Sequence, residues 1–239
     1  MYRASIGWII LCCCAMAACS RPASDDADQP AADSSAATGA DESAAPSAAD
    51  AEGWIAIFNG KSLEGWTPNE HPESWTVKDG ELIAHGERSH LFYTGPVEDH
   101  HFKNFEWKCE IMTKPHSNSG MYFHTDEQEK EWPGKGVEIQ VNNTHDDPIK
   151  TGSIYKVKNI MDNSPVKDDE WFTQHVIVKD KHIVVKVNDK VVNEFEWPDD
   201  FKREEGWENN VIGSGTFALQ AHDPGSEVHF RQVLVKPLP

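Results

Sequence analysis

The fold is decided by the stretch FEWKCEI at Phe105–Ile111, in which apolar residues alternate with charged ones without a break. A period of two is typical of a β-strand that has one face in a hydrophobic core and the other in solvent. The same alternation recurs at residues 137–142, 175–179, 182–187 and 216–222. Because no stretch of ten or more residues keeps the 3.6-residue period of a helix, these segments predict a chain built of β-strands.

Turn signals separate the predicted strands. Asn188-Asp189 lies between two apolar runs, where it indicates a tight hairpin turn. The apolar side of residues 228–235 switches near Arg231-Gln232, which predicts a β-bulge. Short strands, regular turns and the lack of helical segments together predict an all-β domain of two packed antiparallel sheets, a sandwich or jelly roll.

Residues 1–18 have the features of a bacterial export signal. A positive charge at Arg3 precedes an apolar segment that is too short to span a membrane, and Ala17-Ala18 precedes Cys19. This pattern predicts cleavage by the lipoprotein signal peptidase and a lipid on Cys19, and Ser20 favours an outer-membrane anchor on the periplasmic or the exterior face. An ordinary cleaved signal or an uncleaved anchor is the alternative.

Composition indicates how the rest of the chain is organised. Residues 19–52 consist mainly of Ala, Ser, Asp and Pro, which cannot bury enough apolar surface to fold, so we expect a flexible acidic tether. Residues 53–239 then form the β domain. The net charge of −18 makes nucleic acid an unsuitable partner, because DNA and RNA are bound through basic surfaces. Of the five cysteines only Cys109 falls in this domain, so no disulfide can form within it.

Polar side chains share one face of several predicted strands. Opposite the apolar side, residues 137–142 carry a carboxylic acid and two amides, and residues 216–222 carry an amide and an imidazole. If these strands are neighbours, one sheet face collects groups that can hold a sugar. The alternative is a solvated face without function, which is the commoner case. The candidates on this face are Tyr122, His124, Glu138, Gln140, Asn142, Gln220 and His222.

Other chemical motifs are few. None of the twelve histidines belongs to a His-Glu-x-x-His or a Cys/His zinc pattern, so no metal ligand is assigned. His145-Asp146-Asp147 offers nitrogen and oxygen ligands for a divalent cation, with a merely solvated acidic loop as the alternative. The lack of a Gly-x-Ser-x-Gly element, a P-loop and a Gly-x-Gly-x-x-Gly element argues against serine hydrolases, NTPases and Rossmann dehydrogenases.

A set of motifs occurs in order along residues 53–238. The chain reads IFNGKSLEGW at 57–66, NSGMYF at 118–123, GVEIQV at 136–141, LQAH at 219–222 and EVHFR at 227–231. This ordered set resembles the 3-keto-disaccharide hydrolase family, also called the 3-keto-glucoside lyase/hydratase domain. The resemblance implies a concanavalin A-like jelly roll. It also implies cleavage of glycosides whose C3 hydroxyl a partner sugar 3-dehydrogenase has already oxidised.

The resemblance carries over to particular residues. Glu138, Gln140 and His222 match the family pattern, whereas Asn142 stands where the family usually has Asp. A C3 ketone acidifies the C2 hydrogen, so a base can remove it, the C1 substituent can leave, and water can add to the unsaturated sugar. We expect Glu138 to be the base, His222 the acid or the enolate partner, and Gln140 a positioning donor. A divalent cation could stabilise the enolate instead.

Two other classes of function fit the same sequence. Ordinary glycosidases use two carboxylates, and the predicted face offers one clear carboxylate, Glu138, with Asp126 a weaker second at the end of its strand. This single clear carboxylate argues against an ordinary glycosidase. The two other classes are a non-catalytic carbohydrate-binding module and a purely structural lipoprotein.

Overall fold

The computed structural model describes residues 49–239. The predicted export signal, Cys19 and most of the predicted tether lie outside the described residues, so the lipid anchor stays a prediction. In the part of the chain that the structure describes, no helix is long and apolar enough to cross a membrane.

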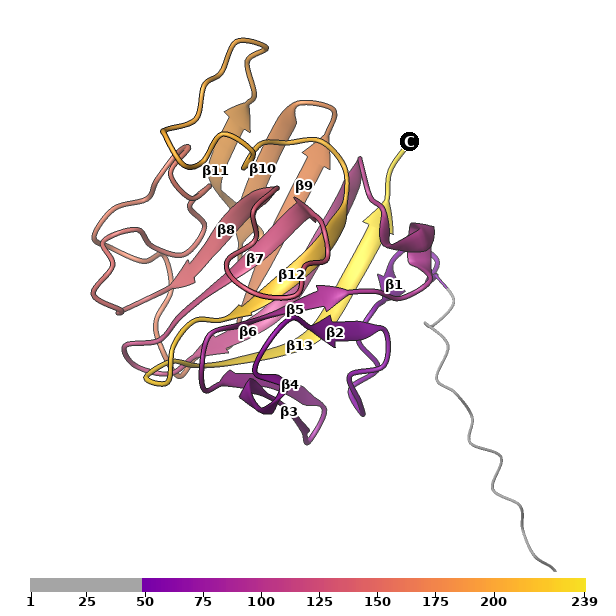
Figure 1. The fold of residues 1–239 in the computed structure, drawn as a ribbon, viewed down its shortest axis with the longest axis vertical. Helices are drawn as coiled ribbons and strands as arrows, with labels where there is room; N and C mark the ends of the chain where they lie inside the picture. The colour runs from indigo at the N-terminus through magenta and orange to yellow at the C-terminus, as the bar shows by residue number, and fades with distance from the viewer. Residues whose placement is uncertain (1–48) are drawn as a thin grey trace, which may run out of the picture. The chain divides into compact units, whose positions relative to one another are not determined.

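Two antiparallel sheets make up the described domain (Figure 1). The larger sheet has eight strands in the order β11, β10, β9, β6, β13, β4 and β3, with β1 also paired to β13. The smaller sheet has five strands in the order β2, β5, β12, β7 and β8. This jelly-roll sandwich confirms the predicted all-β fold class. The strands are β1 (Ile55–Ala56), β2 (Trp66–Pro68), β3 (Trp75–Lys78), β4 (Glu81–His85), β5 (Ser89–Tyr93), β6 (Phe105–Thr113), β7 (Asn118–Thr125), β8 (Val137–Asn142), β9 (Phe172–Lys179), β10 (His182–Val187), β11 (Lys190–Glu196), β12 (Thr216–Ala221) and β13 (Glu227–Pro237), and the short 3-10 helices are η1 (Pro72–Ser74) and η2 (Val97–His100).

The alternation that predicted the fold is present in β6. Phe105, Trp107, Cys109 and Ile111 are fully buried, whereas the charged residues between them are half-buried on the other face of the sheet. The ring of Phe217 from β12 stacks on that of Trp107 with 4.4 Å between the ring centroids, so aromatic side chains join the two sheets. Burial raises the pKa of the Cys109 thiol, which makes Cys109 an unreactive core residue.

Both predicted irregularities of the strands are confirmed. Asn188 and Asp189 have φ angles of 48° and 64° and join β10 to β11, as a hairpin turn with two left-handed residues requires. In β13 the register against β6 shifts between Arg231 and Leu234, where Gln232 has a φ angle of 49°. This bulge explains why the apolar side of the strand changes there.

The smaller sheet is buried on both faces, unlike β6. Every residue of β7, β8 and β12 is buried, including the polar ones. Two connections lie over the outer face, residues 126–136 between β7 and β8 and residues 197–215 between β11 and β12. Asn210 donates a hydrogen bond to the Pro133 carbonyl at 3.2 Å and so links the two connections. The polar face is therefore enclosed rather than solvated.

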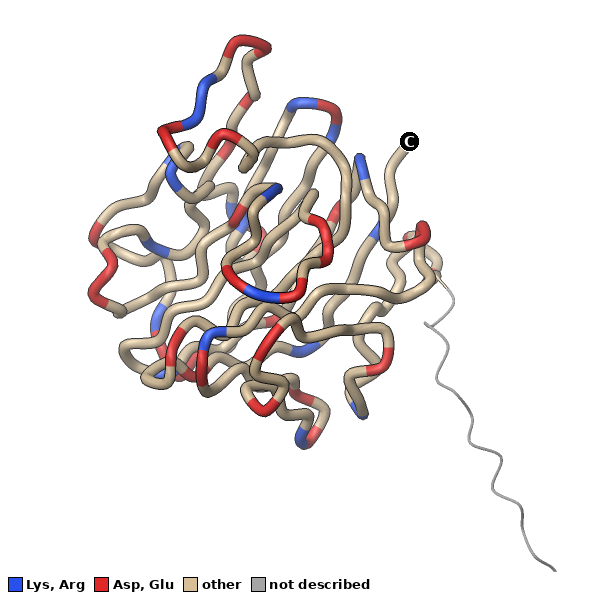
Figure 2. The backbone as a smooth tube through the Cα atoms, viewed as in Figure 1, with Lys and Arg blue, Asp and Glu red and all other residues tan. Residues whose placement is uncertain are grey.

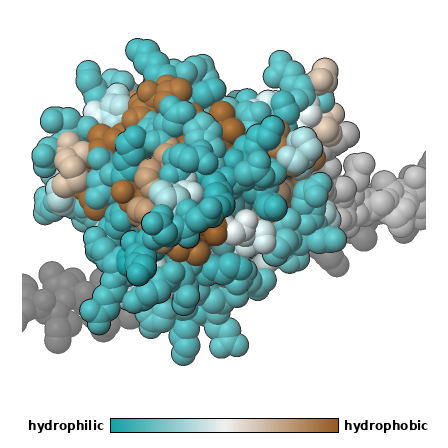
Figure 3. Space-filling model, turned by 90° about the horizontal axis from the view of Figure 1, so that it is seen from above, coloured by the Kyte–Doolittle hydropathy of each residue, from teal (hydrophilic) through white to brown (hydrophobic). Residues whose placement is uncertain are grey.

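Charged side chains are concentrated outside this enclosed face. Figure 2 shows Asp, Glu, Lys and Arg mainly in the connections and at strand ends, with long uncharged stretches along the strands. Figure 3 shows a largely hydrophilic surface on which hydrophobic residues gather in separate patches. The most exposed large apolar side chains of the described domain are Trp132, Met161 and Val191, and Trp132 borders the pocket described next.

Candidate functional site

A pocket of about 420 Å³ lies on the outer face of the smaller sheet. Its floor comes from the three neighbouring strands β12, β7 and β8, and its walls come from the two connections that cover the sheet and from Tyr155 in the connection between β8 and β9. The size suits a small-molecule ligand. The floor carries Asn118, Tyr122, Glu138, Gln140 and Gln220, with His222 just beyond the end of β12, and the walls carry Trp132, Pro133, Gly134, Tyr155 and residues 206–210.

The carboxyl group of the floor belongs to Glu138. Its residue is only 8% exposed, and this burial raises the pKa of Glu138 to about 8. A hydrogen bond from the Tyr122 hydroxyl opposes the shift, whereas the negative charge of Asp147 adds to it. Glu138 therefore keeps its proton at neutral pH, so it can serve as a general acid.

Gly120 of β7 makes room for this carboxyl group. Gly120 pairs with Gln140 across the strands, and the Glu138 side chain lies over it. A Cβ atom at position 120 would collide with Oε1 of Glu138 and would lie 3.0 Å from its Cδ. The absence of a side chain at Gly120 thus fixes where the carboxyl group sits.

A row of hydrogen bonds crosses the floor from β12 to β8. The amide nitrogen of Gln220 donates to the Tyr122 hydroxyl at 2.8 Å, and this hydroxyl donates to the carboxyl group of Glu138. The amide oxygens of Gln220 and Asn118 are buried without a hydrogen-bond partner, although both residues line the pocket. Because buried acceptors are normally paired, these two oxygens are unsatisfied acceptors in residues of the floor.

Tryptophans stand at opposite ends of the floor. The ring centroid of Trp132 lies 5.4 Å from that of His90 in β5 and 5.3 Å from that of His222. The ring centroid of Trp207 lies 5.7 Å from that of Tyr155, whose backbone N–H donates to the Glu138 carbonyl at the edge strand β8. The polar floor is therefore bounded by an aromatic side chain at each end, an arrangement that suits the mixed polar and apolar surface of a sugar.

His222 supplies an imidazole at the Trp132 end of the pocket. It directly follows the last residue of β12, and its side chain is 28% exposed. Nδ1 of the ring lies 2.7 Å from Oδ2 of Asp223, and the ring centroid of His145 lies 5.5 Å away. A half-buried imidazole and a protonated carboxyl group that line the same pocket are both partners that acid–base chemistry requires.

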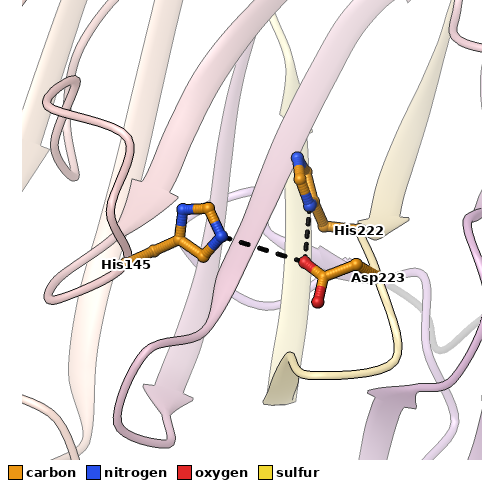
Figure 4. A group of neighbouring side chains, drawn as sticks. All are labelled: His145, His222 and Asp223. Carbon is orange, nitrogen blue, oxygen red and sulfur yellow. Dashed lines mark hydrogen bonds and ion pairs between the residues drawn. The ribbon is translucent and has the colours of Figure 1, made fainter.

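His145, His222 and Asp223 form a group whose ligand atoms lie within 4.8 Å of one another (Figure 4). Of the candidate cation-binding loop His145-Asp146-Asp147, only His145 belongs to this group. Nδ1 of His145 accepts the backbone N–H of Asp147 at 3.1 Å, which leaves the proton of the neutral ring on Nε2. Nε2 faces Oδ2 of Asp223 at 4.0 Å, which is too long for a hydrogen bond. Both ring nitrogens of His145 are thus occupied, Nδ1 by the Asp147 N–H and Nε2 by the ring proton.

The structure brings together most of the residues predicted for the polar face. Tyr122, Glu138, Gln140, Gln220 and His222 all line the pocket. They come from three strands that are adjacent in the sheet, as the shared parity of those strands required.

Asn142 lies outside the pocket and holds a loop instead. Its side-chain nitrogen donates to the carbonyl oxygens of Asp147 and Ile149, both at 2.9 Å. Its side-chain oxygen accepts the backbone N–H of His145 at 2.9 Å. The predicted substrate contact of Asn142 is thus replaced by internal hydrogen bonds, which fix the loop that follows β8.

His124 also lies outside the pocket. Its φ angle is 56°, and the register between β7 and β12 shifts between Thr216 and Phe217. The ring is hydrogen-bonded to the Lys103 carbonyl and to the N–H of Gly213. The irregular pairing breaks the alternation from which the position of His124 was predicted.

Several residues in or near the pocket were not predicted from the sequence, and four of them show why. Asn118 has the parity of Gly120 and Tyr122, so extending the strand backwards would have placed it on the floor. Trp132 and Trp207 lie in connections without periodicity, which gave no signal. Asp223 follows the end of its strand, where parity no longer applies.

Comparisons with known proteins agree with this architecture. A protein named 3-keto-disaccharide hydrolase from Bacteroides thetaiotaomicron is 28% identical over 233 residues, which are 79% of this chain and 80% of that protein. A crystal structure of a candidate glycosyl hydrolase from Parabacteroides distasonis has a TM-score of 0.68 and 24% identity, covering 79% of this chain and 95% of that chain. A carbohydrate-binding module from Bacillus subtilis shares the fold with a TM-score of 0.52 and 13% identity, covering 72% and 95% of the two chains.

The profile of one protein family matches nearly the whole described domain. The match spans residues 53–236, from just before β1 to the end of β13. It includes every strand of both sheets and all the residues that line the pocket. The chain belongs to the family of 3-keto-α-glucoside-1,2-lyase-like domains.

Proposed function

We propose that this protein cleaves glycosides that carry a ketone at C3, by elimination followed by addition of water. The observation that carries the proposal is the presence, in one pocket, of a buried and protonated carboxyl group, Glu138, and an imidazole, His222. The family, and the name 3-keto-disaccharide hydrolase of the relative from Bacteroides thetaiotaomicron, support the choice of substrate.

The proposed reaction has two stages. A base takes the proton from C2, and the electron pair of the C2–H bond forms the enolate of the C3 ketone. The ketone then reforms, a double bond forms between C1 and C2, and the bond from C1 to the leaving oxygen breaks as that oxygen takes a proton from an acid. Water finally adds across the double bond, with its hydroxyl on C1 and a hydrogen on C2. The sum is hydrolysis without a redox partner.

The burial of Glu138 suits the acid of this scheme. A carboxyl group whose pKa is raised to about 8 carries a proton at neutral pH and can pass it to the leaving oxygen. His222 is then the base at C2. These roles reverse those expected from the sequence, because a strand pattern does not reveal that a polar position is covered by a distant connection.

The remaining polar groups have separate tasks in this scheme. The unpartnered amide oxygens of Asn118 and Gln220 accept hydrogen bonds from sugar hydroxyls. The amide oxygen of Gln140 accepts the N–H of Val141 at 3.2 Å, so the amide N–H groups of Gln140 are the ones left to stabilise the enolate oxygen.

Glu208 supports a second candidate function, ordinary glycoside hydrolysis. It also lines the pocket, and a pair of carboxylates is what ordinary glycoside hydrolysis requires. Glu208 is exposed, however, and hydrogen bonds from its own N–H and from that of Gly206 lower its pKa. We favour elimination because Glu208 belongs to the solvent-facing connection between β11 and β12, whereas Glu138 and His222 lie at the sheet.

Rates with a 3-keto-disaccharide and with the same disaccharide unoxidised test the proposal. We expect the wild type to turn over the 3-keto substrate alone. Glu138→Gln is expected to lower kcat/KM by about 10²–10⁴-fold, the usual contribution of a general acid. Glu208→Gln is expected to cost less than about 10-fold, because a wall carboxylate only positions the substrate. Glu196→Gln, on the exposed edge strand β11 of the other sheet, is the matched control.

Two results would overturn the proposal in different ways. Turnover of the unoxidised disaccharide that is abolished by both Glu138→Gln and Glu208→Gln would identify an ordinary glycosidase. Sugar binding without turnover of either substrate, weakened by Trp132→Ala and Trp207→Ala, would identify a carbohydrate-binding module.

A further inference from the structure

Asp223, which no strand pattern singled out, is held by hydrogen bonds at both carboxylate oxygens. Oδ2 accepts a hydrogen bond from the Ser226 hydroxyl at 2.8 Å, and Oδ1 accepts the backbone N–H of Gly225 at 2.8 Å. The Ser226 hydroxyl in turn accepts the N–H of Asn118 at 2.9 Å, which ties the turn after β12 to β7. The carboxylate therefore has a fixed orientation toward its neighbour His222 (Figure 4).

This carboxylate is ionised. Partial burial would by itself raise the pKa of Asp223, but hydrogen bonds from His222, Ser226 and Gly225 outweigh it and lower the pKa below its ordinary value. An ionised carboxylate can only accept hydrogen bonds. The hydrogen between Asp223 and His222, which joins atoms 2.7 Å apart, must therefore be carried by Nδ1 of the imidazole.

The position of that proton determines what the other ring nitrogen can do. A neutral imidazole carries one proton, so a proton on Nδ1 leaves a lone pair on Nε2. The groups that face the ring are Trp132, His145 and His90. Burial lowers the pKa of His90 to about 3, and the Trp132 indole carries no charge, so Asp223 supplies the negative charge that faces the imidazole.

We propose that Asp223 is a positioning residue that holds His222 in the Nδ1–H tautomer, with Nε2 unprotonated and presented to the pocket. The role of this Nε2 as the base at C2 rests on the function proposed above. In that step Nε2 takes the C2 proton, the electron pair of the C2–H bond enters the enolate, and the imidazolium ion that forms is stabilised by the Asp223 carboxylate. The imidazolium ion exchanges this proton with solvent, and in the hydration stage Nε2 passes a proton back to C2 and becomes unprotonated again.

Histidine ¹⁵N NMR on the full chain reads the tautomer directly, without any substrate. The His222 signals are assigned by their loss in His222→Gln. We expect a protonated Nδ1 and an unprotonated Nε2 for His222 in the wild type. In Asp223→Asn the amide oxygen is expected to keep the hydrogen bond from the Gly225 N–H, so the amide NH₂ faces the His222 ring. Nδ1 must then accept a hydrogen bond from this NH₂, and the ring proton of His222 should move to Nε2. Asp180→Asn, in the exposed turn between β9 and β10, makes the same chemical change far from the pocket.

Kinetics with a 3-keto glycoside test the consequence for catalysis. Asp223→Asn is expected to lower kcat/KM by about 10²–10⁴-fold, as loss of the correct tautomer does in a histidine-based site, and Asp180→Asn should leave it unchanged. Ser226→Ala, which removes one hydrogen bond to Asp223, should give an intermediate loss. A wild-type His222 protonated on Nε2 would overturn the inference even if Asp223→Asn failed to fold.

The remaining outcomes separate this inference from the proposed function. Full activity of Asp223→Asn with a shifted tautomer would overturn the catalytic role of the pair. The expected tautomer in a wild type that turns over no 3-keto glycoside would uphold the positioning by Asp223 and refute the proposed function. Activity abolished by a chelator and restored by Mn²⁺ would make the three residues of Figure 4 metal ligands and overturn the inference.

Discussion

At the scale of single residues, the protonation of Glu138 controls the pH dependence of the proposed reaction. An acid with a pKa of about 8 is active while protonated, so we predict that kcat/KM falls as pH rises through about 8. A pH–rate profile with a 3-keto glycoside measures this. A rate that rises through the same range would restore Glu138 to the role of base.

The same carboxyl group makes the stability of the fold depend on pH. Between the ordinary pKa of 4.5 and the folded value of about 8, the folded protein keeps a proton that the unfolded chain releases. Stability contributed by this group is therefore complete below about pH 4.5 and is lost as pH rises toward about 8. We predict that urea unfolding midpoints fall less between pH 5 and pH 8 in Glu138→Gln than in the wild type or in Glu196→Gln. Parallel changes in all three proteins would contradict the buried, protonated state.

Gly120 offers a test of how the carboxyl group is placed. A methyl group at position 120 would displace the Glu138 side chain, because the added Cβ would collide with Oε1. Gly120 does not have a positive φ angle, so alanine is tolerated by the backbone. We predict that Gly120→Ala lowers kcat/KM by about 10²-fold, the effect of a displacement of about 1 Å. Gly213→Ala, with open space at the Cβ position, is the control, and equal rates of the two variants would refute the steric argument.

At the scale of elements, the loop after β8 depends on a buried ammonium group. Nζ of Lys150 donates to the carbonyl oxygens of His145 and Asp147 at 2.6 and 2.7 Å. Asn142 binds the same loop from the end of β8. These contacts keep Asp147 close enough to influence the pKa of Glu138, so a residue outside the pocket affects its electrostatics.

Replacing that ammonium group should weaken the loop and the site together. We predict that Lys150→Met lowers the free energy of unfolding by about 1–3 kcal/mol, because the His145 carbonyl oxygen loses this donor and the Asp147 carbonyl oxygen keeps only the one from Asn142. kcat/KM should fall as well, since Asp147 and His145 would move. Urea denaturation and kinetics measure both effects, with Lys190→Met at the exposed start of β11 as the control. A Lys150→Met variant as stable as this control would show that the loop is held by other contacts.

The strands and most of the pocket floor were predictable because their information is local. Alternation in β6, β8 and β12 assigns each side chain to a face, and the turn and bulge residues mark where alternation stops. His124 was misplaced because its irregular pairing is set by the partner strand. Trp132, Trp207 and the depth of Glu138 were not predictable, because they depend on connections that reach the sheet from elsewhere in the sequence. The resemblance to the family indicated a glycoside-acting enzyme, whereas the proposed direction of proton transfer depends on the burial of Glu138.

At the scale of the whole molecule, the described domain is one part of an exported protein in our account. We propose that Cys19 carries the lipid and that residues 19–52 tether the domain to the outer membrane. We predict that Cys19→Ala releases the protein from the membrane fraction, because the lipid is its anchor. Cell fractionation tests this, and a variant that stays with the membranes would show that another segment holds it.

The proposed reaction also requires a separate enzyme at the same location. The acid, base and hydrogen-bond donors that we propose for the pocket do not remove hydride from C3. We propose that a sugar 3-dehydrogenase supplies the 3-keto substrate. The tether then serves to keep the β domain where that substrate is produced.

Carrying out the reaction in D₂O distinguishes cleavage by elimination and hydration from direct displacement at C1. In elimination the hydrogen at C2 is removed and later replaced from solvent, whereas direct displacement at C1 leaves it in place. We predict that the 3-keto sugar released early in the wild-type reaction carries deuterium at C2, as measured by NMR and mass spectrometry. The control is the same sugar incubated in D₂O with Glu138→Gln, which measures exchange at C2 without cleavage. Product that retains its original hydrogen at C2 would contradict the account.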